Sequence, residues 1–246
     1  PEETITVFPL LKFEFESEVE VPCKLAYEEA CEVTLNGEIV PVVKDGYFTD
    51  KAIHTMPLPA LKKGKNVLLV KAPIGKRVSL ENYFLLGDFG VRVNGCEAVI
   101  TKKPEKLAFG SVISQGLPFY GANITYKLPL DVTRDGELVI RSDLYRGALI
   151  GARLDGKEVG RIVLSPYLLK LPDVKKGAHT LELTLFGTRQ NSFGALHNCS
   201  HAKWQGPDYW YSGGVSWAYE YQLSDMGILK SPFIEVYAEK EKEKNA

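Results

Sequence analysis

Two phrases of the sequence occur twice in the same order, and this duplication constrains the fold more than any other feature. LPALKKG at residues 58–64 matches LPDVKKG at residues 171–177 in five of seven positions. Upstream, VTLNGEIV at residues 33–40 resembles ARLDGKEV at residues 152–159. The turn pairs inside these octets are 119 residues apart and the Lys-Lys-Gly triplets 113. We therefore predict two divergent copies of one domain, connected near Pro104.

Strand and turn signals dominate both copies. Residues 10–18 alternate apolar and polar side chains, as a strand with one buried face requires. The Asn-Gly pairs at 36–37 and 94–95 predict hairpin turns, because both residue types accept the positive φ of a type I′ turn. The apolar runs 66–72 and 180–186 predict buried strands. The pattern indicates an all-β chain of two tandem antiparallel β-sandwich domains.

These signals also predict where the domains lie. We expect a first domain at residues 1–104, a second at 105–238, and a charged, solvated tail at 239–246. The repeated LPxxKKG phrase is expected to be a loop that leads into a turn.

Composition argues against two classes of partner. With 30 basic and 31 acidic residues the formal net charge is −1, which provides no electrostatic basis for binding nucleic acid or an anionic membrane. We find no run of 18 apolar residues and no signal-peptide pattern. The sequence begins at Pro1 and a strand pattern follows almost at once, so we expect a fragment of a longer parent protein.

Several phrases of the second copy resemble a known family. LPFYGANITY (117–126), YRGA (145–148), IGARLDGKEVG (150–160) and SPY (165–167) are similar to segments of galactose-binding-like jelly-roll domains of bacterial glycoside hydrolases. The first copy resembles a diverged member of the same fold. The resemblance implies two jelly-roll sandwiches that serve as an accessory module, with the catalytic domain elsewhere in the parent. It also implies an extracellular or periplasmic location, which nothing else in the sequence indicates.

The second copy alone contains a long aromatic stretch at residues 189–222, with all three tryptophans of the chain. Flat Trp and Tyr rings stack on the apolar C–H faces of sugars, while polar side chains bind the hydroxyl groups. The predicted glycan contacts are therefore the rings and polar residues of this stretch: Trp204, Trp210, Tyr211, Trp217, Asp208, Gln205, Arg189, Asn191 and His197.

Two other interpretations of the aromatic stretch stay open. Its rings could dock against another domain of the parent, or cover an open edge of the sandwich. Within WAYEY at 217–221, alternation predicts a strand with Trp217, Tyr219 and Tyr221 on one face. We therefore expect this end of the stretch to be core, and residues 204–211 to be the contact surface.

Metal and thiol chemistry have weaker support. His197, Cys199 and His201 form an H-x-C-x-H pattern, but the spacings of common zinc sites are absent, so we expect ordinary loop residues. No cofactor is predicted, although a structural calcium ion held by loop carboxylates stays open. The cysteines are expected to be reduced, with a Cys23–Cys31 bridge as the alternative.

Catalysis is also not predicted. A glycoside hydrolase needs two carboxylates roughly 5 to 10 Å apart, and Asp208, Glu220 and Asp225 lie in or near the aromatic stretch. A chain with 31 acidic residues places some of them near aromatics by chance. We predict a non-catalytic carbohydrate-binding or architectural module pair, whose partner is a glycan or the catalytic domain of the parent. A small glycoside hydrolase and a purely structural docking module are the alternatives.

Overall fold

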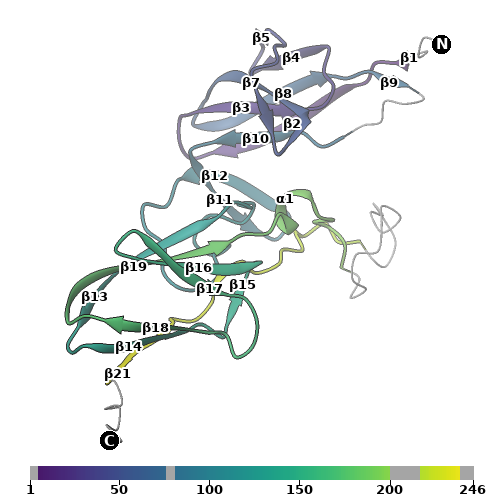
Figure 1. The fold of residues 1–246 in the computed structure, drawn as a ribbon. Coiled ribbons are helices and arrows are strands. Elements are labelled where there is room, and N and C mark those ends of the chain that lie inside the picture. The colour runs from purple at the N-terminus through teal and green to yellow at the C-terminus, as the bar shows by residue number, and fades with distance from the viewer. Residues whose placement is uncertain (1–4, 76–80, 200–216, 239–246) are drawn as a thin grey trace, which may run out of the picture. The chain divides into compact units, whose positions relative to one another are not determined.

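A computed structural model describes residues 5–75, 81–199 and 217–238. The chain divides into two compact units, Pro1–Pro104 (unit 1) and Glu105–Ala246 (unit 2), each described here by itself (Figure 1). Strands make up most of the regular structure in the described ranges, and the helix present is the short α1 (Gln190–Phe193). None of the described helical residues form a segment long and apolar enough to cross a membrane.

The described residues of unit 1 form three sheets. Its strands are β1 (Ile5–Val7), β2 (Leu10–Ser17), β3 (Val21–Tyr27), β4 (Glu32–Leu35), β5 (Glu38–Val40), β6 (Tyr47–Phe48), β7 (Asp50–Leu61), β8 (Gly64–Lys71), β9 (Ile74–Gly75), β10 (Phe84–Gly87), β11 (Phe89–Asn94) and β12 (Glu97–Lys102). The sheet orders are β11-β12-β2-β8-β4-β5, β10-β3-β7-β6 and β1-β9. The predicted antiparallel pairing has an exception, because β12 runs parallel to β2.

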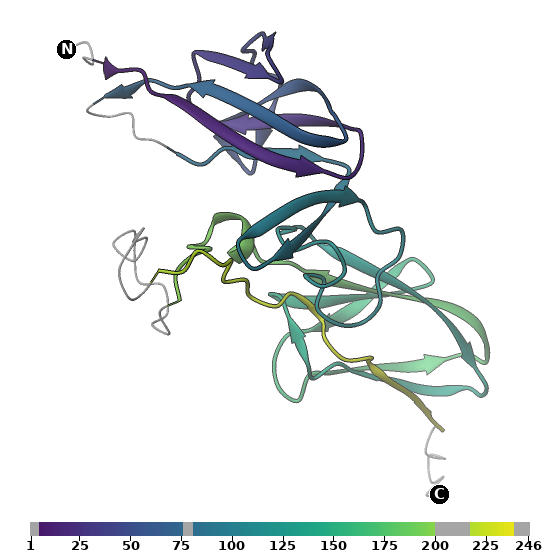
Figure 2. The same cartoon turned by 180° about the vertical axis from the view of Figure 1, so that it is seen from behind.

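Three sheets are also found in the part of unit 2 that the structure describes. Its strands are β13 (Ile124–Val132), β14 (Gly136–Arg141), β15 (Tyr145–Arg146), β16 (Leu149–Leu154), β17 (Lys157–Ile162), β18 (Leu168–Val174), β19 (Gly177–Phe186), β20 (Gly227–Ile228) and β21 (Phe233–Tyr237). They are ordered β13-β19-β16-β17, β18-β14-β21 and β15-β20. The edge strand β17 is irregular, since its register with β16 shifts between Ala152 and Arg153. In Figure 2 the yellow C-terminal segment runs along unit 2 into β21.

The two units share a strand order. The order β2-β8-β4-β5 of unit 1 corresponds to β13-β19-β16-β17 of unit 2, and β10-β3-β7 corresponds to β21-β14-β18. The repeated phrases fall on equivalent elements, because the turn pairs join β4 to β5 and β16 to β17, and the Lys-Lys-Gly triplets lead into β8 and β19. This agreement is what two copies of one domain should give.

The predicted hairpin turn at Asn36–Gly37 is present, the turn at Asn94–Gly95 joins β11 to β12 with positive φ at Gly95 alone, and the counterpart of the first turn is found in unit 2. Asn36 and Gly37 have φ values of 53° and 84°, and Asp155 and Gly156 have values of 50° and 78°. Two consecutive residues with positive φ are the mark of a type I′ turn, whose twist matches that of the strands it joins.

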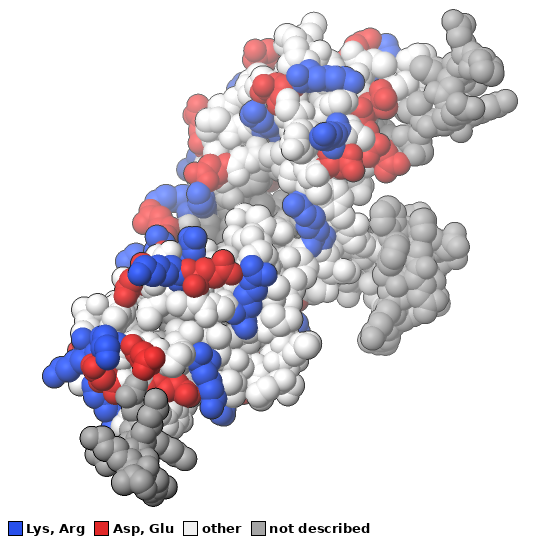
Figure 3. Space-filling view, in the orientation of Figure 1, with Lys and Arg blue, Asp and Glu red and all other residues white. Residues whose placement is uncertain are grey.

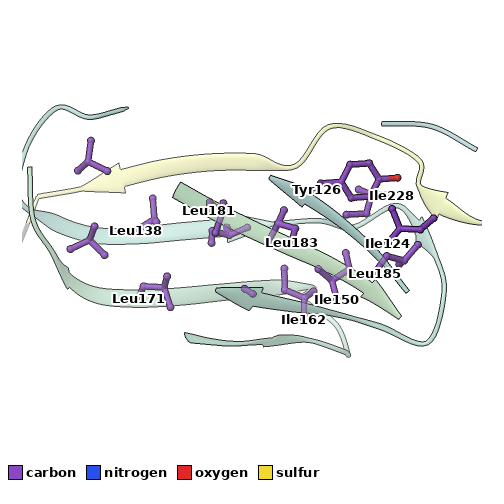
Figure 4. Close-up of a cluster of buried hydrophobic side chains, with 14 of the residues drawn as sticks. Ile124, Tyr126, Leu138, Ile150, Ile162, Leu171, Leu181, Leu183, Leu185 and Ile228 are labelled. Atoms are coloured by element: carbon purple, nitrogen blue, oxygen red, sulfur yellow. The ribbon is translucent and has the colours of Figure 1, made fainter. Parts of the chain in front are cut away.

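In each unit, residues of two sheets contribute to one buried core. In unit 2, alternate residues of β19, namely Leu181, Leu183 and Leu185, are fully buried and share a cluster with Leu138 and Leu171 of the other sheet (Figure 4). In unit 1, Leu68 and Val70 of β8 belong to a cluster with Leu25 and Met56 of the second sheet. Alternation along each strand therefore produces a core between two sheets, with each sheet also presenting an outer face.

The sequence expectation for the repeated LPxxKKG phrase was wrong. The LPxxKKG phrase is not a loop, because its first four residues end β7 in unit 1 and β18 in unit 2. Proline usually disfavours a strand, but Pro59 and Pro172 each fall where the register shifts, opposite Val21–Cys23 and Gly136–Leu138. A β-bulge leaves a residue without a ladder hydrogen bond, so it tolerates a proline that has no N–H to donate.

Candidate functional site

The chain enters the aromatic stretch through α1, which fastens it to two other segments of unit 2. Asn191 is 8% exposed. Its Nδ2 donates hydrogen bonds to the backbone oxygens of Pro118 (3.0 Å) and Ser224 (2.9 Å), and its Oδ1 accepts one from the N–H of Ser224 (2.9 Å). The hydroxyl of Ser192 donates to the backbone oxygen of Phe119 at 2.7 Å. These contacts fix the positions from which nearby rings project.

Five rings then follow one another in a series that we call the ring row. Successive ring centroids are 5.4 Å apart for Phe119 and Tyr221, 4.9 Å for Tyr221 and His197, 5.5 Å for His197 and Trp217, and 4.5 Å for Trp217 and Tyr219. The first and last contacts are edge-on, while the middle planes differ by 38° and 33°. The middle rings therefore use much of their faces on each other.

Backbone contacts hold the row together beneath the rings. Asn198 and Trp217 form an isolated antiparallel bridge, and the N–H of Ala218 donates to the backbone oxygen of His197 at 2.8 Å. His197 Nδ1 lies 3.1 Å from the backbone oxygen of Ala218. Because a carbonyl oxygen can only accept, this contact requires a proton on Nδ1.

Tyr219 is the most accessible ring of the row. Its side chain is 75% exposed, at the end of the row beside Trp217. The expectation that residues 217–221 form a core strand was wrong, because apart from the bridge at Trp217 these residues are not in a strand. The rings pack on one another in series. Tyr219 was consequently missed as a candidate contact, and its alternation with Trp217 gave no signal of exposure.

The other predicted contacts have different positions. Arg189 precedes α1 and is exposed, and its backbone oxygen accepts hydrogen bonds from the N–H groups of Ser192 and Phe193. Asn191 faces the protein, with both amide hydrogens on backbone oxygens. His197 and Trp217 belong to the ring row. The remaining predicted residues lie outside the described ranges: Trp204, Gln205, Asp208, Trp210 and Tyr211.

The residues considered for other chemistry are only partly described. Glu220 and Asp225 are exposed, whereas Asp208 and His201 fall outside the described ranges. Within those ranges no group of three or more His, Cys, Asp or Glu side chains could hold a metal ion. Zinc at the H-x-C-x-H pattern and structural calcium stay open as sequence interpretations.

Cys23, Cys31 and Cys96 are free thiols. Cys23 is buried, and its burial raises the pKa of the thiol to about 11, while Cys31 is exposed. The alternative of a Cys23–Cys31 bridge is therefore not realised in the structure. A buried thiol with a raised pKa is a weak nucleophile, so Cys23 acts as a core residue.

A separate shallow depression of about 270 Å³ lies between the end of β14 and the start of β21. Its lining combines two cations, a carboxylate, a hydroxyl and one ring: Arg141, Lys230, Asp143, Ser231, Phe233 and the neighbouring Pro232. On the face drawn in Figure 3, basic and acidic side chains are interspersed and leave wide uncharged areas. The depression thus offers a polar site made from segments other than the ring row.

Comparison with known proteins identified no family. No protein-family model matches the chain, and no curated protein matches it. Among solved structures, it is similar to a rhamnosidase from Novosphingobium sp. PP1Y, with 16% sequence identity and a TM-score of 0.35. The match covers 92% of this chain and 22% of the rhamnosidase chain.

Proposed function

We propose that this chain is a pair of non-catalytic β-sandwich modules of the galactose-binding-like jelly-roll type, and that the ring row of unit 2 binds a glycan. The observation that carries the proposal is the exposed Tyr219 at the end of a row of packed rings. A sugar has apolar C–H faces that stack on such a ring, and the ring loses little conformational freedom because Trp217 already supports it.

The anchoring of the row supports the same function. The side chains of Asn191 and Ser192 donate hydrogen bonds to the backbone oxygens of Pro118, Phe119 and Ser224, so the rings are positioned before any ligand arrives. Pre-positioned contacts lower the entropic cost of binding. The parent protein would then supply catalysis from another domain, as the resemblance of the second copy to accessory domains implies.

The test is a glycan-array screen with the whole chain, followed by calorimetry on the glycans that bind. Replacing Tyr219 with Ala should weaken binding about fivefold or more, since stacking on one ring contributes roughly 1 kcal/mol or more. The matched control is Phe233→Ala, which removes a ring that is 50% exposed but lies outside the ring row. Loss of binding in the Phe233 variant alone would assign the site to the depression and contradict the proposal.

Two alternatives give different results in the same samples. A docking module binds no glycan, so a blank array would overturn the carbohydrate-binding proposal and favour contact with another domain of the parent. A small glycoside hydrolase would release the chromophore from aryl glycosides. That turnover should disappear in Glu220→Gln or Asp225→Asn if these carboxylates act on the bond.

A further inference from the structure

A hairpin turn in each unit is braced by the same hydrogen bond from equivalent positions. In unit 1, Asn36 Oδ1 accepts from the N–H of Val67 at 2.9 Å. In unit 2, Asp155 Oδ1 accepts from the N–H of Thr180 at 2.8 Å. Asn36 and Asp155 begin the equivalent turns, and Val67 and Thr180 hold the same place after the Lys-Lys-Gly triplets.

In unit 1 the brace continues through a second amide. Asn66 is fully buried, and its Oδ1 accepts from Asn36 Nδ2 at 2.9 Å and from the N–H of Lys62 at 3.0 Å. Its Nδ2 donates to the backbone oxygens of Lys62 (2.7 Å) and Gly64 (3.0 Å). Amides do not titrate in the physiological range, so this arrangement is the same at any ordinary pH.

In unit 2 a titratable pair takes the place of the two asparagines. His179 lies where unit 1 has Asn66, and Asp155 where it has Asn36. His179 Nδ1 is 2.7 Å from Asp155 Oδ2, and Nε2 is 2.8 Å from the backbone oxygen of Lys175, the counterpart of Lys62. The His179 side chain is 16% exposed and that of Asp155 51%.

This geometry requires a doubly protonated imidazole. An ionised carboxylate and a backbone carbonyl are both acceptors, so each ring nitrogen must carry a proton to make both contacts. Neutral histidine has one N–H, and its other nitrogen would direct a lone pair at an oxygen. The pKa of His179 is accordingly raised, first by the hydrogen bond to Asp155 and then by the Lys175 carbonyl. The pKa of Asp155 is lowered, first by the N–H of Thr180 and then by His179.

The charged groups near Asp155 and His179 do not oppose the raised pKa of His179 or the lowered pKa of Asp155. The β16–β17 hairpin contributes Lys157, whose charge also lowers the pKa of Asp155. The Nζ of Lys175 is paired with Asp135 Oδ2 at 3.1 Å, in the turn between β13 and β14. The residue that β13 places opposite His179 is the uncharged Leu130. Asp155 is thus the carboxylate in direct contact with the His179 ring.

We propose that Asp155 and His179 form a pH-sensitive clasp that holds the β16–β17 hairpin to the turn before β19, and that the duplicated clasp of unit 1 is insensitive to pH. The histidine contribution is complete below the unfolded pKa of about 6.5 and is lost as pH rises through the higher folded value. The aspartate contribution is present above about pH 4 and is lost as pH falls through its lowered folded value. The clasp is therefore strongest between these two limits.

The test compares two amides in one sample of the whole chain. Hydrogen exchange of the Thr180 amide, corrected for its intrinsic pH dependence, reports on the clasp, and the Val67 amide is the internal control. Between pH 5.5 and pH 8.5 the protection of Thr180 relative to Val67 should fall severalfold, because His179 loses the second proton that its two contacts require. An equal response of the two amides would overturn the proposal.

Exchanging the clasp residues between the two units gives a matched pair of variants. Asp155→Asn with His179→Asn places the chemistry of unit 1 in unit 2 and should abolish the pH response of Thr180. Asn36→Asp with Asn66→His should transfer a response to Val67. A response of Thr180 that survives the first exchange would contradict the clasp. If that variant does not fold, an NMR titration of the His179 ring in the unmodified chain decides, since a pKa at or below about 6.5 excludes the clasp.

Discussion

Gly227 lies so close to Gly110 that a β-carbon at position 227 would stand 2.2 Å from the backbone oxygen of Gly110. The N–H of Gly110 donates to the backbone oxygen of Ile228 at 2.8 Å, and the N–H of Val112 donates to Met226 at 2.8 Å. These bonds attach the segment before β13 to the strand β20. The close approach of two backbones is what only a glycine at 227 permits.

Replacing Gly227 with Ala should therefore destabilise unit 2 by about 3 kcal/mol or more, measured by urea unfolding. Gly177→Ala is the matched control, because its φ of 144° is nearly that of Gly227 at 143°, while a β-carbon there meets nothing within 4 Å. The control should lose only about 1 kcal/mol from backbone strain. Equal losses in the two variants would show that the contact with Gly110 has no energetic consequence.

Replacing Asn191, which ties α1 to the segments that carry the ring row, should also lower the free energy of unfolding. Asn191→Ala removes the side-chain partner of the backbone oxygen of Pro118 and of the backbone N–H and C=O of Ser224. A loss of about 1 to 3 kcal/mol is expected, because the buried backbone oxygen of Pro118 then lacks its hydrogen bond. Asn191→Asp retains the acceptor but directs a second oxygen at the backbone oxygens of Pro118 and Ser224, so equilibrium unfolding should find it no more stable than the Ala variant. Unchanged stability in Asn191→Ala would refute the anchoring role.

Two tyrosines of the ring row should behave differently. Tyr221 lies between Phe119 and His197, so Tyr221→Ala should lower the free energy of unfolding by about 2 kcal/mol. Tyr219 is mostly exposed, and Tyr219→Ala should change it by less than about 0.5 kcal/mol. Denaturant titrations of both variants measure this difference. A large loss in the Tyr219 variant would mean that this ring is a packing residue and is not free for a ligand.

The lowered pKa of Asp135 predicts how the stability of the protein changes at acidic pH. Its pKa is lowered, chiefly by the N–H of Lys176 and next by the side chain of Lys175. A lowered folded pKa stabilises the protein above the unfolded value of about 4, and this contribution disappears as pH falls through the folded value. Asp135→Asn should therefore be less stable than the unmodified chain at pH 7, and the two should converge near pH 2. Thermal unfolding at both pH values checks this, and a constant difference would contradict it.

Features set by neighbouring residues could be predicted from the sequence. The turn at Asn36 and Gly37 depends on two residues that accept positive φ, and β8 and β19 depend on short apolar runs. The strand ends at Pro59 and Pro172 could not be predicted, because a bulge depends on the partner strand. Local pattern alone does not record such pairing.

The ring row depends on contacts between distant segments. Phe119 meets Tyr221 next to the point where Asn191 ties Pro118 to Ser224, and no periodicity in residues 189–222 signals these contacts. The clasp is different, since a residue-by-residue alignment of the two copies places His179 opposite Asn66. Substitution of a titratable pair for two amides was thus visible in the sequence, although its geometry was not.

The irregular edge strand β17 has a consequence for behaviour at high concentration. An edge strand exposes backbone N–H and C=O groups that a strand from a second molecule could pair with. The register shift between Ala152 and Arg153, together with Gly160 at φ 147°, bends this row of groups out of a straight line. A straight incoming strand could match only part of it, so the bulge discourages the growth of continuous intermolecular sheets, which are the first step toward fibrils.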